Sequence, residues 1–360
     1  MNGERQRYKE PAVDFAAEKI DAFLVTSPAN VRYLSGFTGS NGVLLATGNG
    51  SAVFFTDPRY ALQSSQEVSC LVNVVPRGGL IAAVAQYLRR RRIRRVGFEK
   101  NHISYHQFSF LDQKLPDGVN LKPIEGAVER QRMVKSESEL AAIRASVLTN
   151  SRAFDRTLKK VRPGMTESEI AAELDYQMRK LGAESSAFET IVASGERTAL
   201  PHARPTTRKV GADELVLIDM GATQAGYASD MTRMVHAGRK ARKAEQLYRA
   251  VLEAQLAAID TVRSGVPASR VDAAARQILK RHGLDKSFTH STGHGLGLEI
   301  HEPPRLGRGD KTRLEAGMAI TIEPGVYLPG FGGIRIEDTV VVTEAGCEVL
   351  TPTSKELVTI

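Results

Sequence analysis

The second part of this sequence contains an internal repeat, which restricts the possible folds more than any other feature. Val161–Met165 matches Val262–Val266 at an offset of 101 residues. Each of these two segments precedes an expected helix. The helices end at Gly182 and Gly283, which are also 101 residues apart, and glycine often ends a helix. We therefore expect residues 128–360 to form two similar halves packed about a pseudo-twofold axis.

Capping-box sequences mark the first helices of this region. Ser136 is followed three residues later by Glu139, and Thr166 by Glu169. In this pattern each side chain satisfies a backbone N–H of the other residue. We expect one helix to run from Ser136 to about Val161 and the next to begin at Thr166.

The first half carries a hairpin with two acidic residues. The apolar run Glu214–Ile218 predicts a buried strand that ends at Asp219. If the chain turns at Gln224-Ala225, Asp230 lies directly opposite Asp219. Opposed residues have Cβ atoms about 4.5–5.5 Å apart. Two like charges at that distance repel unless a cation lies between them.

The second half repeats this arrangement with glutamates. The apolar run Met318–Ile322 precedes Glu323, and a turn centred on Gly330 places Glu337 opposite it. Glu323 lies 104 residues after Asp219, and Glu337 lies 107 residues after Asp230. Both offsets exceed 101, which small loop insertions explain.

Four acids in equivalent positions of a repeat differ from isolated ones. A single acid at a strand end is usually a turn or cap residue. Packing the two halves together would instead bring four carboxylates into a place with little water. Burying four unpaired carboxylates is prohibitive, and four negative charges match two divalent cations. The sequence therefore predicts a site for two metal ions.

A glycine-rich segment between the two hairpins supplies histidines. His290 and His294 have the spacing of a zinc pair on a helix, but Gly293, Gly295 and Gly297 argue against a helix. We expect an extended segment that passes close to a ligand. One imidazole with four carboxylates is an oxygen-rich set, which favours manganese, iron or cobalt and leaves zinc open.

The first part of the chain, residues 1–127, alternates strands and helices and predicts an α/β domain. A chain of 360 residues suits two domains, and we place the boundary between residues 127 and 128. The expected strands are Ala22–Thr26, Gly42–Thr47, Ala52–Phe55 and Val72–Val75, and the expected helices are Pro11–Ile20, Pro58–Gln66 and Gly79–Arg90.

Charge and composition limit the possible partners. The formal net charge is +8, and the densest basic run is Arg89–Arg95. This run follows an apolar-periodic stretch, so it fits an exposed helix C-terminus, and no nucleic-acid motif accompanies it. We expect no nucleic-acid partner. No signal peptide or membrane span is evident, and Cys70 and Cys347 suggest two buried thiols, so we expect no membrane partner and a cytoplasmic location.

Taken together, these motifs resemble the pita-bread metallopeptidases, in their aminopeptidase P and prolidase branch. The resemblance covers essentially the whole chain, because Tyr33–Gly42 and Thr56–Gln63 resemble the creatinase-type N-terminal domain of those enzymes. It implies an α+β fold, with a creatinase-like α/β domain before a pita-bread catalytic domain. The catalytic motifs are Asp219-Met-Gly-Ala, Gly226-Tyr-Ala-Ser-Asp-Met-Thr-Arg233, Ser291-Thr-Gly-His-Gly-Leu-Gly297, Thr321-Ile-Glu-Pro-Gly325 and Gly333-Ile-Arg-Ile-Glu-Asp338.

The resemblance also implies roles for single residues. His202, His301 and Glu323 would be catalytic, while His290 and Arg335 would contact substrate or support the site; Tyr327 is a further candidate. The cofactors would be two divalent metal ions, with manganese expected and cobalt, iron or zinc as alternatives. The five implied metal ligands are Asp219, Asp230, His294, Glu323 and Glu337.

The implied activity is that of a metallo-exopeptidase of the Xaa-Pro aminopeptidase type. It would release the residue before a proline in second position, by attack of a hydroxide that bridges the two metal ions. The partner would be a proline-containing peptide, and the protein a homodimer. Two alternatives stay open. One is an Xaa-Pro dipeptidase (prolidase) restricted to dipeptides, and the other is a non-catalytic pita-bread binding protein, which would be expected to lose ligands.

Overall fold

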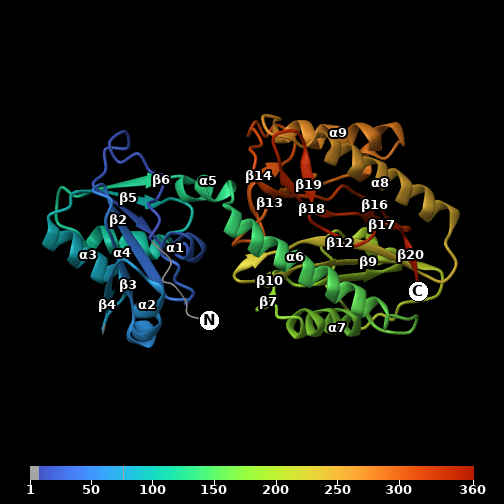
Figure 1. Cartoon of the computed structure of the whole chain (residues 1–360), viewed down its shortest axis with the longest axis horizontal. Helices are drawn as coiled ribbons and strands as arrows, with labels where there is room; N and C mark the ends of the chain where they lie inside the picture. The colour runs from blue at the N-terminus through green and yellow to red at the C-terminus, as the bar shows by residue number, and fades with distance from the viewer. Residues whose placement is uncertain (1–7, 76) are drawn as a thin grey trace. The chain divides into compact units, whose positions relative to one another are not determined.

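The computed structural model describes residues 8–75 and 77–360 (Figure 1). The chain divides into two compact units, Met1–Arg132 and Met133–Ile360. The boundary predicted between residues 127 and 128 falls at the start of helix α5 (Ala127–Met133). In the described part of the chain, no helix is both long enough and apolar enough to cross a membrane.

The first unit is built on a six-stranded mixed sheet with the strand order β4-β3-β2-β1-β5-β6. Strands β1 and β3 are buried along their full length, as expected for a sheet that is covered on both faces. The strands are β1 (Ala22–Val25), β2 (Gly42–Thr47), β3 (Ala52–Thr56), β4 (Leu71–Val74), β5 (Arg95–Glu99) and β6 (Asn120–Ile124). The helices are α1 (Pro28–Ser35), η1 (Pro58–Tyr60), α2 (Ala61–Glu67), α3 (Leu80–Arg91) and α4 (Tyr105–Lys114).

Most predicted elements of this unit are confirmed, but the helix predicted for Pro11–Ile20 is wrong. The segment forms turns instead. The Asp14 carboxylate accepts hydrogen bonds from the backbone N–H groups of Ala16 and Ala17, which starts a single turn. Lys19 then adopts a φ of 55°, which ends it.

The arginine-rich run is at a helix end, as predicted. Arg89, Arg90 and Arg91 form the last turn of α3, and Arg92 caps it with a φ of 56°. All four side chains are exposed, so this run is solvated surface in the first unit.

The second unit contains two pairs of helices, one in each half of the repeat (Figure 1). The capping boxes predicted at Ser136 and Thr166 are both present. The helices are α6 (Glu137–Leu158), α7 (Glu167–Lys180), α8 (Arg242–Thr261) and α9 (Ala268–Arg281).

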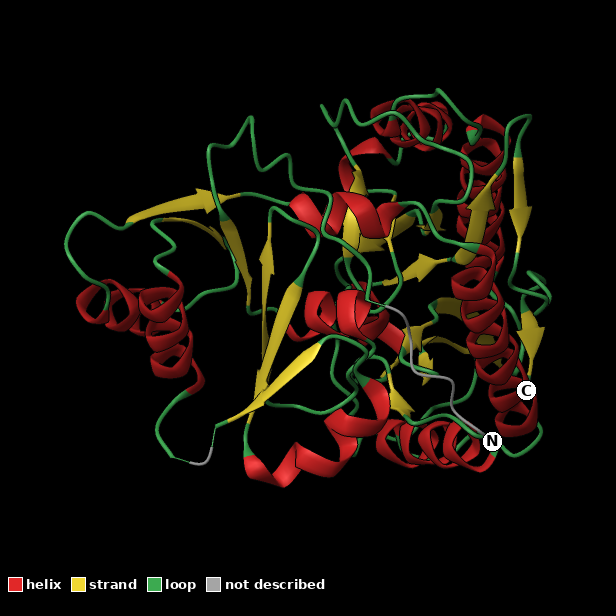
Figure 2. Ribbon diagram, turned by 60° about the vertical axis from the view of Figure 1, so that its left-hand side comes forward, coloured by secondary structure: helices red, strands yellow, loops and turns green. Residues whose placement is uncertain are grey.

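Two main sheets lie between these helix pairs, with the orders β20-β12-β9-β8 and β14-β13-β15-β18-β19 (labelled in Figure 1; Figure 2 shows helices and strands in separate colours). Two smaller sheets, β11-β10-β7 and β16-β17, accompany them. The short 3₁₀ segments are η2 (Gly195–Ala199) and η3 (Asp285–Ser287). The strands are β7 (Ser185–Ser186), β8 (Ile191–Ser194), β9 (Glu214–Met220), β10 (Ala222–Gln224), β11 (Tyr227–Ala228), β12 (Met231–Ala237), β13 (Gly293–Gly295), β14 (Glu302–Leu306), β15 (Ala319–Ile322), β16 (Gly325–Leu328), β17 (Gly332–Arg335), β18 (Asp338–Val342), β19 (Cys347–Val349) and β20 (Val358–Thr359).

The hydrophobic core explains why β9 has an unbroken apolar sequence. Leu215 and Leu217 pack into a cluster with residues of the second half, whereas Val216 and Ile218 pack against α7. Alternate residues of a strand point to opposite faces, so both faces of β9 are buried. Asp219 continues the face of Leu215 and Leu217, which is turned toward the second half.

The predicted repeat is visible in the hydrogen bonds. Gly164 N donates to Val210 O, and at the equivalent place Gly265 N donates to Leu314 O, both at 2.8 Å. An isolated strand-type bridge stands beside each of these bonds, between Thr166 and Lys209 and between Pro267 and Arg313.

The register predicted for the first hairpin is wrong. Asp219 lies within β9 and pairs with Thr232 of β12, not with Asp230. The turn is at Ala225-Gly226, one residue later than predicted, and both residues have positive φ angles of 50° and 79°. Positive φ at both central residues is the tight hairpin turn that fits the twist of two strands.

The register predicted for the second hairpin is confirmed. Ile322 pairs with Asp338 in β15 and β18, and Gly325 pairs with Arg335 in β16 and β17. Glu323 and Glu337 occupy the matching positions between these two pairs. The turn is centred on Gly330, as predicted.

The glycine-rich segment is extended, as predicted, but its glycines have a different purpose. Gly293 and Gly295 belong to β13. A Cβ atom on Gly293 would lie 1.9 Å from Thr321 O, and one on Gly295 would lie 2.2 Å from Pro303 O. The close neighbour is therefore the backbone of adjoining segments and not a ligand.

Candidate metal centre

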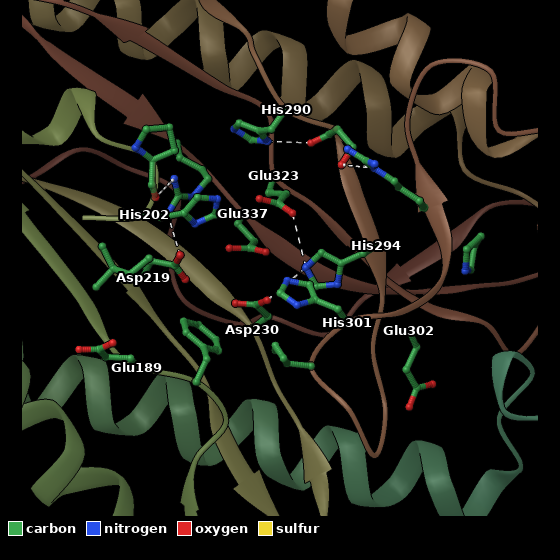
Figure 3. A pocket seen from close by; sticks show the side chains of 18 of the residues that line it. Glu189, His202, Asp219, Asp230, His290, His294, His301, Glu302, Glu323 and Glu337 are labelled. Atoms are coloured by element: carbon green, nitrogen blue, oxygen red, sulfur yellow. Dashed lines mark hydrogen bonds and ion pairs between the residues drawn. The ribbon is translucent and has the colours of Figure 1, made fainter. Parts of the chain in front are cut away.

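The second unit contains a cavity of about 940 Å³, and all of the predicted site residues except Tyr327 line it (Figure 3). Figure 3 shows the labelled carboxylates and imidazoles gathered around one centre, with Glu189 and Glu302 further out. The predicted residues on the cavity wall are His202, Asp219, Asp230, His290, His294, His301, Glu323, Arg335 and Glu337.

Both halves of the repeat contribute acids to this centre. Asp219 and Asp230 come from the first half, and Glu323 and Glu337 from the second. One ligand atom each from Asp230, His294 and Glu337 lie within 4.8 Å of one another. His294 Nε2 is 3.5 Å from Asp230 Oδ2 and 3.5 Å from Glu323 Oε1.

His294 is oriented as a metal ligand would be. Its Nδ1 lies 2.9 Å from Gly295 O, so this nitrogen donates its proton to the carbonyl. Nε2 then keeps its lone pair and faces the carboxylates. Burial lowers the pKa of His294 to about 4, which leaves the ring neutral at neutral pH.

The carboxylates are not balanced by protein cations alone. Burial raises the pKa values of Asp230 and Glu337 well above the usual range, and neighbouring carboxylates raise them further. Burial also raises the pKa of Glu323 to about 7. Asp219 Oδ1 is buried and has no hydrogen-bond partner among the described residues. These oxygens and the free lone pair of His294 Nε2 fit the ligand set of divalent cations.

Arg335 and Thr232 hold the outer oxygens of two of these acids. Arg335 Nη2 donates to Asp219 Oδ2 at 2.6 Å, and its Nε donates to Thr232 Oγ1 at 3.0 Å. Thr232 Oγ1 in turn donates to Glu337 Oε2 at 2.6 Å. Acids from opposite halves are thus fixed by one connected network.

The network continues from Arg335 to His290. Arg335 Nη1 donates to Tyr327 OH at 2.7 Å, and Tyr327 OH lies 2.9 Å from His290 Nε2. His290 Nδ1 donates to Ser291 O at 2.8 Å, so Nε2 accepts the tyrosine proton. Burial lowers the pKa of His290 to about 4 and raises that of Tyr327 to about 12. Both groups are therefore neutral. Every hydrogen bond of this network then has a fixed donor and a fixed acceptor, from Arg335 through Tyr327 to His290.

His202 and His301 lie at the open side of the cavity, where both are exposed. The ring of His301 is 4.4 Å from that of His294, in an edge-to-face arrangement. The pKa of His301 is lowered, first by partial desolvation of its ring. A neutral ring at this place can donate a hydrogen bond to a bound molecule.

Helix α9 holds the segment that leads into β13. Asp272 Oδ1 accepts from Thr292 N at 3.2 Å and from Thr292 Oγ1 at 2.9 Å. Arg276 pairs with Asp272 and donates to His290 O at 2.5 Å. Thr292 O accepts from Glu323 N at 2.7 Å. The helix thereby positions both His290 and Glu323.

Sequence reasoning missed Thr232, Arg233, Asp272 and Arg276. Arg233 is buried, donates to Glu337 O at 2.6 Å and pairs with Asp338 at 2.7 Å. For Arg233 the available signal was an arginine in the middle of a predicted strand, since buried arginines are almost always paired.

Comparisons with known proteins agree with this geometry. Residues 141–344 match the model of metallopeptidase family M24, and residues 12–134 match the creatinase/prolidase N-terminal domain. An Xaa-Pro dipeptidase of Pyrococcus furiosus is 35% identical, over 97% of this chain and 98% of the relative.

Solved structures resemble the whole chain. The structure of an Xaa-Pro dipeptidase from Bacillus anthracis matches with a TM-score of 0.93 and 39% identity, over 96% of this chain and 97% of that one. An X-Pro aminopeptidase from Thermotoga maritima matches with a TM-score of 0.89 and 37% identity, over 95% of this chain and 98% of that one. The expected creatinase-like domain followed by a pita-bread domain is therefore confirmed, and the chain belongs to metallopeptidase family M24.

Proposed function

We propose that this protein is a dinuclear-metal-dependent Xaa-Pro peptidase of the aminopeptidase P type. The observation that carries the proposal is the group of four carboxylates and one neutral imidazole around a single cavity. The similar proteins named Xaa-Pro dipeptidase and X-Pro aminopeptidase support a substrate with proline after the scissile bond. The proposed metal ligands are Asp219, Asp230, His294, Glu323 and Glu337.

Two divalent ions bound by these residues would supply Lewis acidity toward the scissile carbonyl and a nucleophile at neutral pH. We propose manganese, because the donor set is rich in oxygen, with cobalt, iron or zinc as alternatives. The protein's own part is to fix the geometry. Arg335 and Thr232 orient carboxylates from opposite halves, so little rearrangement is needed when the ions bind.

Glu323 is the proposed proton carrier. Its side chain is 17% exposed at the cavity, more than that of Asp230 at 7%. A carboxylate with some access to the cavity can take a proton from water and pass it to the leaving nitrogen of the substrate.

His202 and His301 are the proposed substrate contacts. Both imidazoles line the cavity and are exposed, so each can donate a hydrogen bond to a carbonyl oxygen or to the oxyanion that forms there. His290 and Arg335 would act through the network that ends at Asp219.

Proline fits this kind of site. Its amide has no N–H, so an enzyme that grips the substrate through that N–H cannot use it. A site that works through the carbonyl oxygen does not need the missing donor.

Substrate length separates this proposal from the dipeptidase alternative. We would treat the protein with a chelator, restore Mn²⁺, and assay Ala-Pro and Ala-Pro-Ala. Release of alanine from the tripeptide is the expected result. Turnover of the dipeptide alone would indicate a prolidase, and no turnover of either would overturn the proline assignment.

Metal analysis tests the non-catalytic alternative. Two equivalents of divalent metal per chain are expected after reconstitution. Failure to bind metal or to be activated by it would favour a binding protein. The homodimer and the cytoplasmic location expected from the sequence stay predictions.

A further inference from the structure

A second cavity adjoins the one that contains the candidate metal centre. It has a volume of about 650 Å³ and shares four wall residues with the first: His290, Ser291, Arg305 and Asp310. The two cavities are therefore neighbouring compartments of one site. We call the second the cationic annex, because its wall contains four positive residues and only two negative ones, Asp285 and Asp310. The positive residues are Arg276, Lys286, Arg305 and Arg308.

Three of these cations are available to a ligand. Arg276 is already engaged by Asp272 and by the His290 carbonyl. Lys286, Arg305 and Arg308 are exposed, and none forms an ion pair with any residue that the structure describes. The Asp310 carboxylate accepts from Thr312 N at 2.8 Å, which ties it to its own loop.

The two compartments differ in charge. The inner cavity is lined by seven acidic residues and three arginines, and four of the acids form the candidate metal centre, whereas the annex presents four positive and two negative groups. A peptide with its scissile carbonyl at the metal centre would find a favourable place in the annex for a negative group. Lys286 and Arg308 line the annex but not the inner cavity, so they would meet only a part of the peptide that extends out of the inner cavity. In the proposed activity only one residue precedes the cleaved bond, so the part that extends is the one after the proline.

The sizes of the cavities leave the annex available to a third residue. The inner cavity, at about 940 Å³, is large enough to hold a dipeptide by itself. A dipeptide would therefore leave the annex empty. One further residue extends the chain by about 3.3–3.6 Å, and its side chain reaches beyond that.

We propose that Lys286 and Arg308 bind an acidic side chain on the residue that follows the proline. The inference rests on the proposed function and names its substrate class: peptides of the form Xaa-Pro-Glu or Xaa-Pro-Asp. Electrostatic complementarity of this kind raises association rates and discriminates between partners.

The test compares two substrates that differ by one charge. The Mn²⁺-loaded protein is given Ala-Pro-Glu-amide and Ala-Pro-Gln-amide, in which the C-terminal charge is removed. We expect kcat/KM to be about fivefold higher for the glutamate peptide, the scale of two partly exposed charge pairs. Higher ionic strength should reduce the ratio. The double variant Lys286→Ser/Arg308→Ser should bring the ratio to about one, and Lys286→Arg/Arg308→Lys should retain it.

A matched control removes two cations elsewhere. Arg270 and Lys280 are exposed on α9 and line neither cavity, so Arg270→Ser/Lys280→Ser changes the net charge equally and should keep the wild-type ratio. Equal rates for both amides in the wild type, or an unchanged ratio in Lys286→Ser/Arg308→Ser, would overturn the inference. Hydrolysis of the dipeptide Ala-Pro but of neither tripeptide amide would also overturn the inference, although it would leave the proline assignment intact. No hydrolysis of any proline peptide would instead overturn the proposed function itself.

Discussion

Thr232 uses one hydroxyl group to connect both halves of the repeat. It accepts from Arg335 Nε and donates to Glu337 Oε2, and it is fully buried. Because the hydroxyl accepts on one side and donates on the other, it fixes the Glu337 oxygen that it touches as an acceptor. The other oxygen of Glu337 is then free to face the centre of the cavity.

Replacing Thr232 with valine should weaken metal binding without unfolding the protein. Valine has almost the same shape but offers no hydrogen bond, so Glu337 loses its support. Outer partners of metal ligands typically contribute about 10–100-fold in affinity. Titration calorimetry with Mn²⁺ would measure the change. Thr232→Ser keeps the hydroxyl and should bind nearly as the wild type does; an unchanged Kd in Thr232→Val would remove this residue from the network.

Asp230→Asn should abolish metal-dependent activity while the fold survives. We expect kcat/KM to fall by at least about 100-fold. Since burial and neighbouring carboxylates raise the pKa of Asp230, the neutral amide should also leave the metal-free protein at least as stable as the wild type. Activity assays and thermal melts without metal would check both effects. Activity like that of the wild type would exclude Asp230 from the site.

At the scale of elements, helix α9 fixes a loop that carries site residues. The Asp272–Arg276 pair forms hydrogen bonds with the backbone of His290 and Thr292, and Thr292 O accepts a hydrogen bond from Glu323 N. The equivalent helix of the first half, α7, uses Asp175 in a similar way, because its carboxylate accepts from Ser186 and Thr190 ahead of β8. In each half, hydrogen bonds to a helix thus hold the segment that precedes a site strand: α7 holds the segment before β8, and α9 holds the segment before β13.

Arg276→Gln should loosen this segment. The variant loses charge-assisted hydrogen bonds that typically contribute about 1.5–3 kcal/mol each, so residues 288–294 should exchange backbone hydrogens faster and turnover should fall. Hydrogen-exchange mass spectrometry with and without Mn²⁺ would localise the effect. Arg270→Gln, on the exposed face of the same helix, is the control. Unaltered exchange in Arg276→Gln would show that α9 does not hold the segment.

At the scale of the whole molecule, the buried acids link stability to pH. The pKa of Glu323 rises from 4.5 to about 7 in the folded protein. The folded state therefore binds the proton more tightly than the unfolded state, and this stability is lost as pH rises through that window. For Glu323 alone the loss is on the order of 3 kcal/mol.

Between pH 5.5 and pH 7.5 the metal-free wild type should accordingly lose stability relative to a metal-free Glu323→Gln variant. The comparison is needed because the lowered pKa values of His290 and His294 add stability over this range in both proteins. Urea unfolding after chelation would measure the difference. Added Mn²⁺ should restore more stability at the higher pH, because the carboxylates are then free to bind it. A stability difference between the wild type and Glu323→Gln that stays constant from pH 5.5 to pH 7.5 would contradict this account.

The sequence could predict a structural feature when the residues that cause it are close together in the chain. The capping boxes at Ser136 and Thr166 are local, and both helices begin as predicted. The turn at Ala225-Gly226 requires a positive φ at an alanine, which local patterns do not reveal. Thr232 could not be assigned because its partner, Glu337, is 105 residues away.

One proposed metal ligand, His294, has no equivalent ligand in the other half of the repeat. The residue 101 positions before His294 is Ala193, and the hydrogen bonds of β8 and β13 place the two at equivalent sites. The proposed centre therefore has one nitrogen ligand where strict symmetry would give two or none. Two ions held there would experience unequal surroundings, and Mn²⁺ would fill the protein stepwise, with two distinct dissociation constants rather than one.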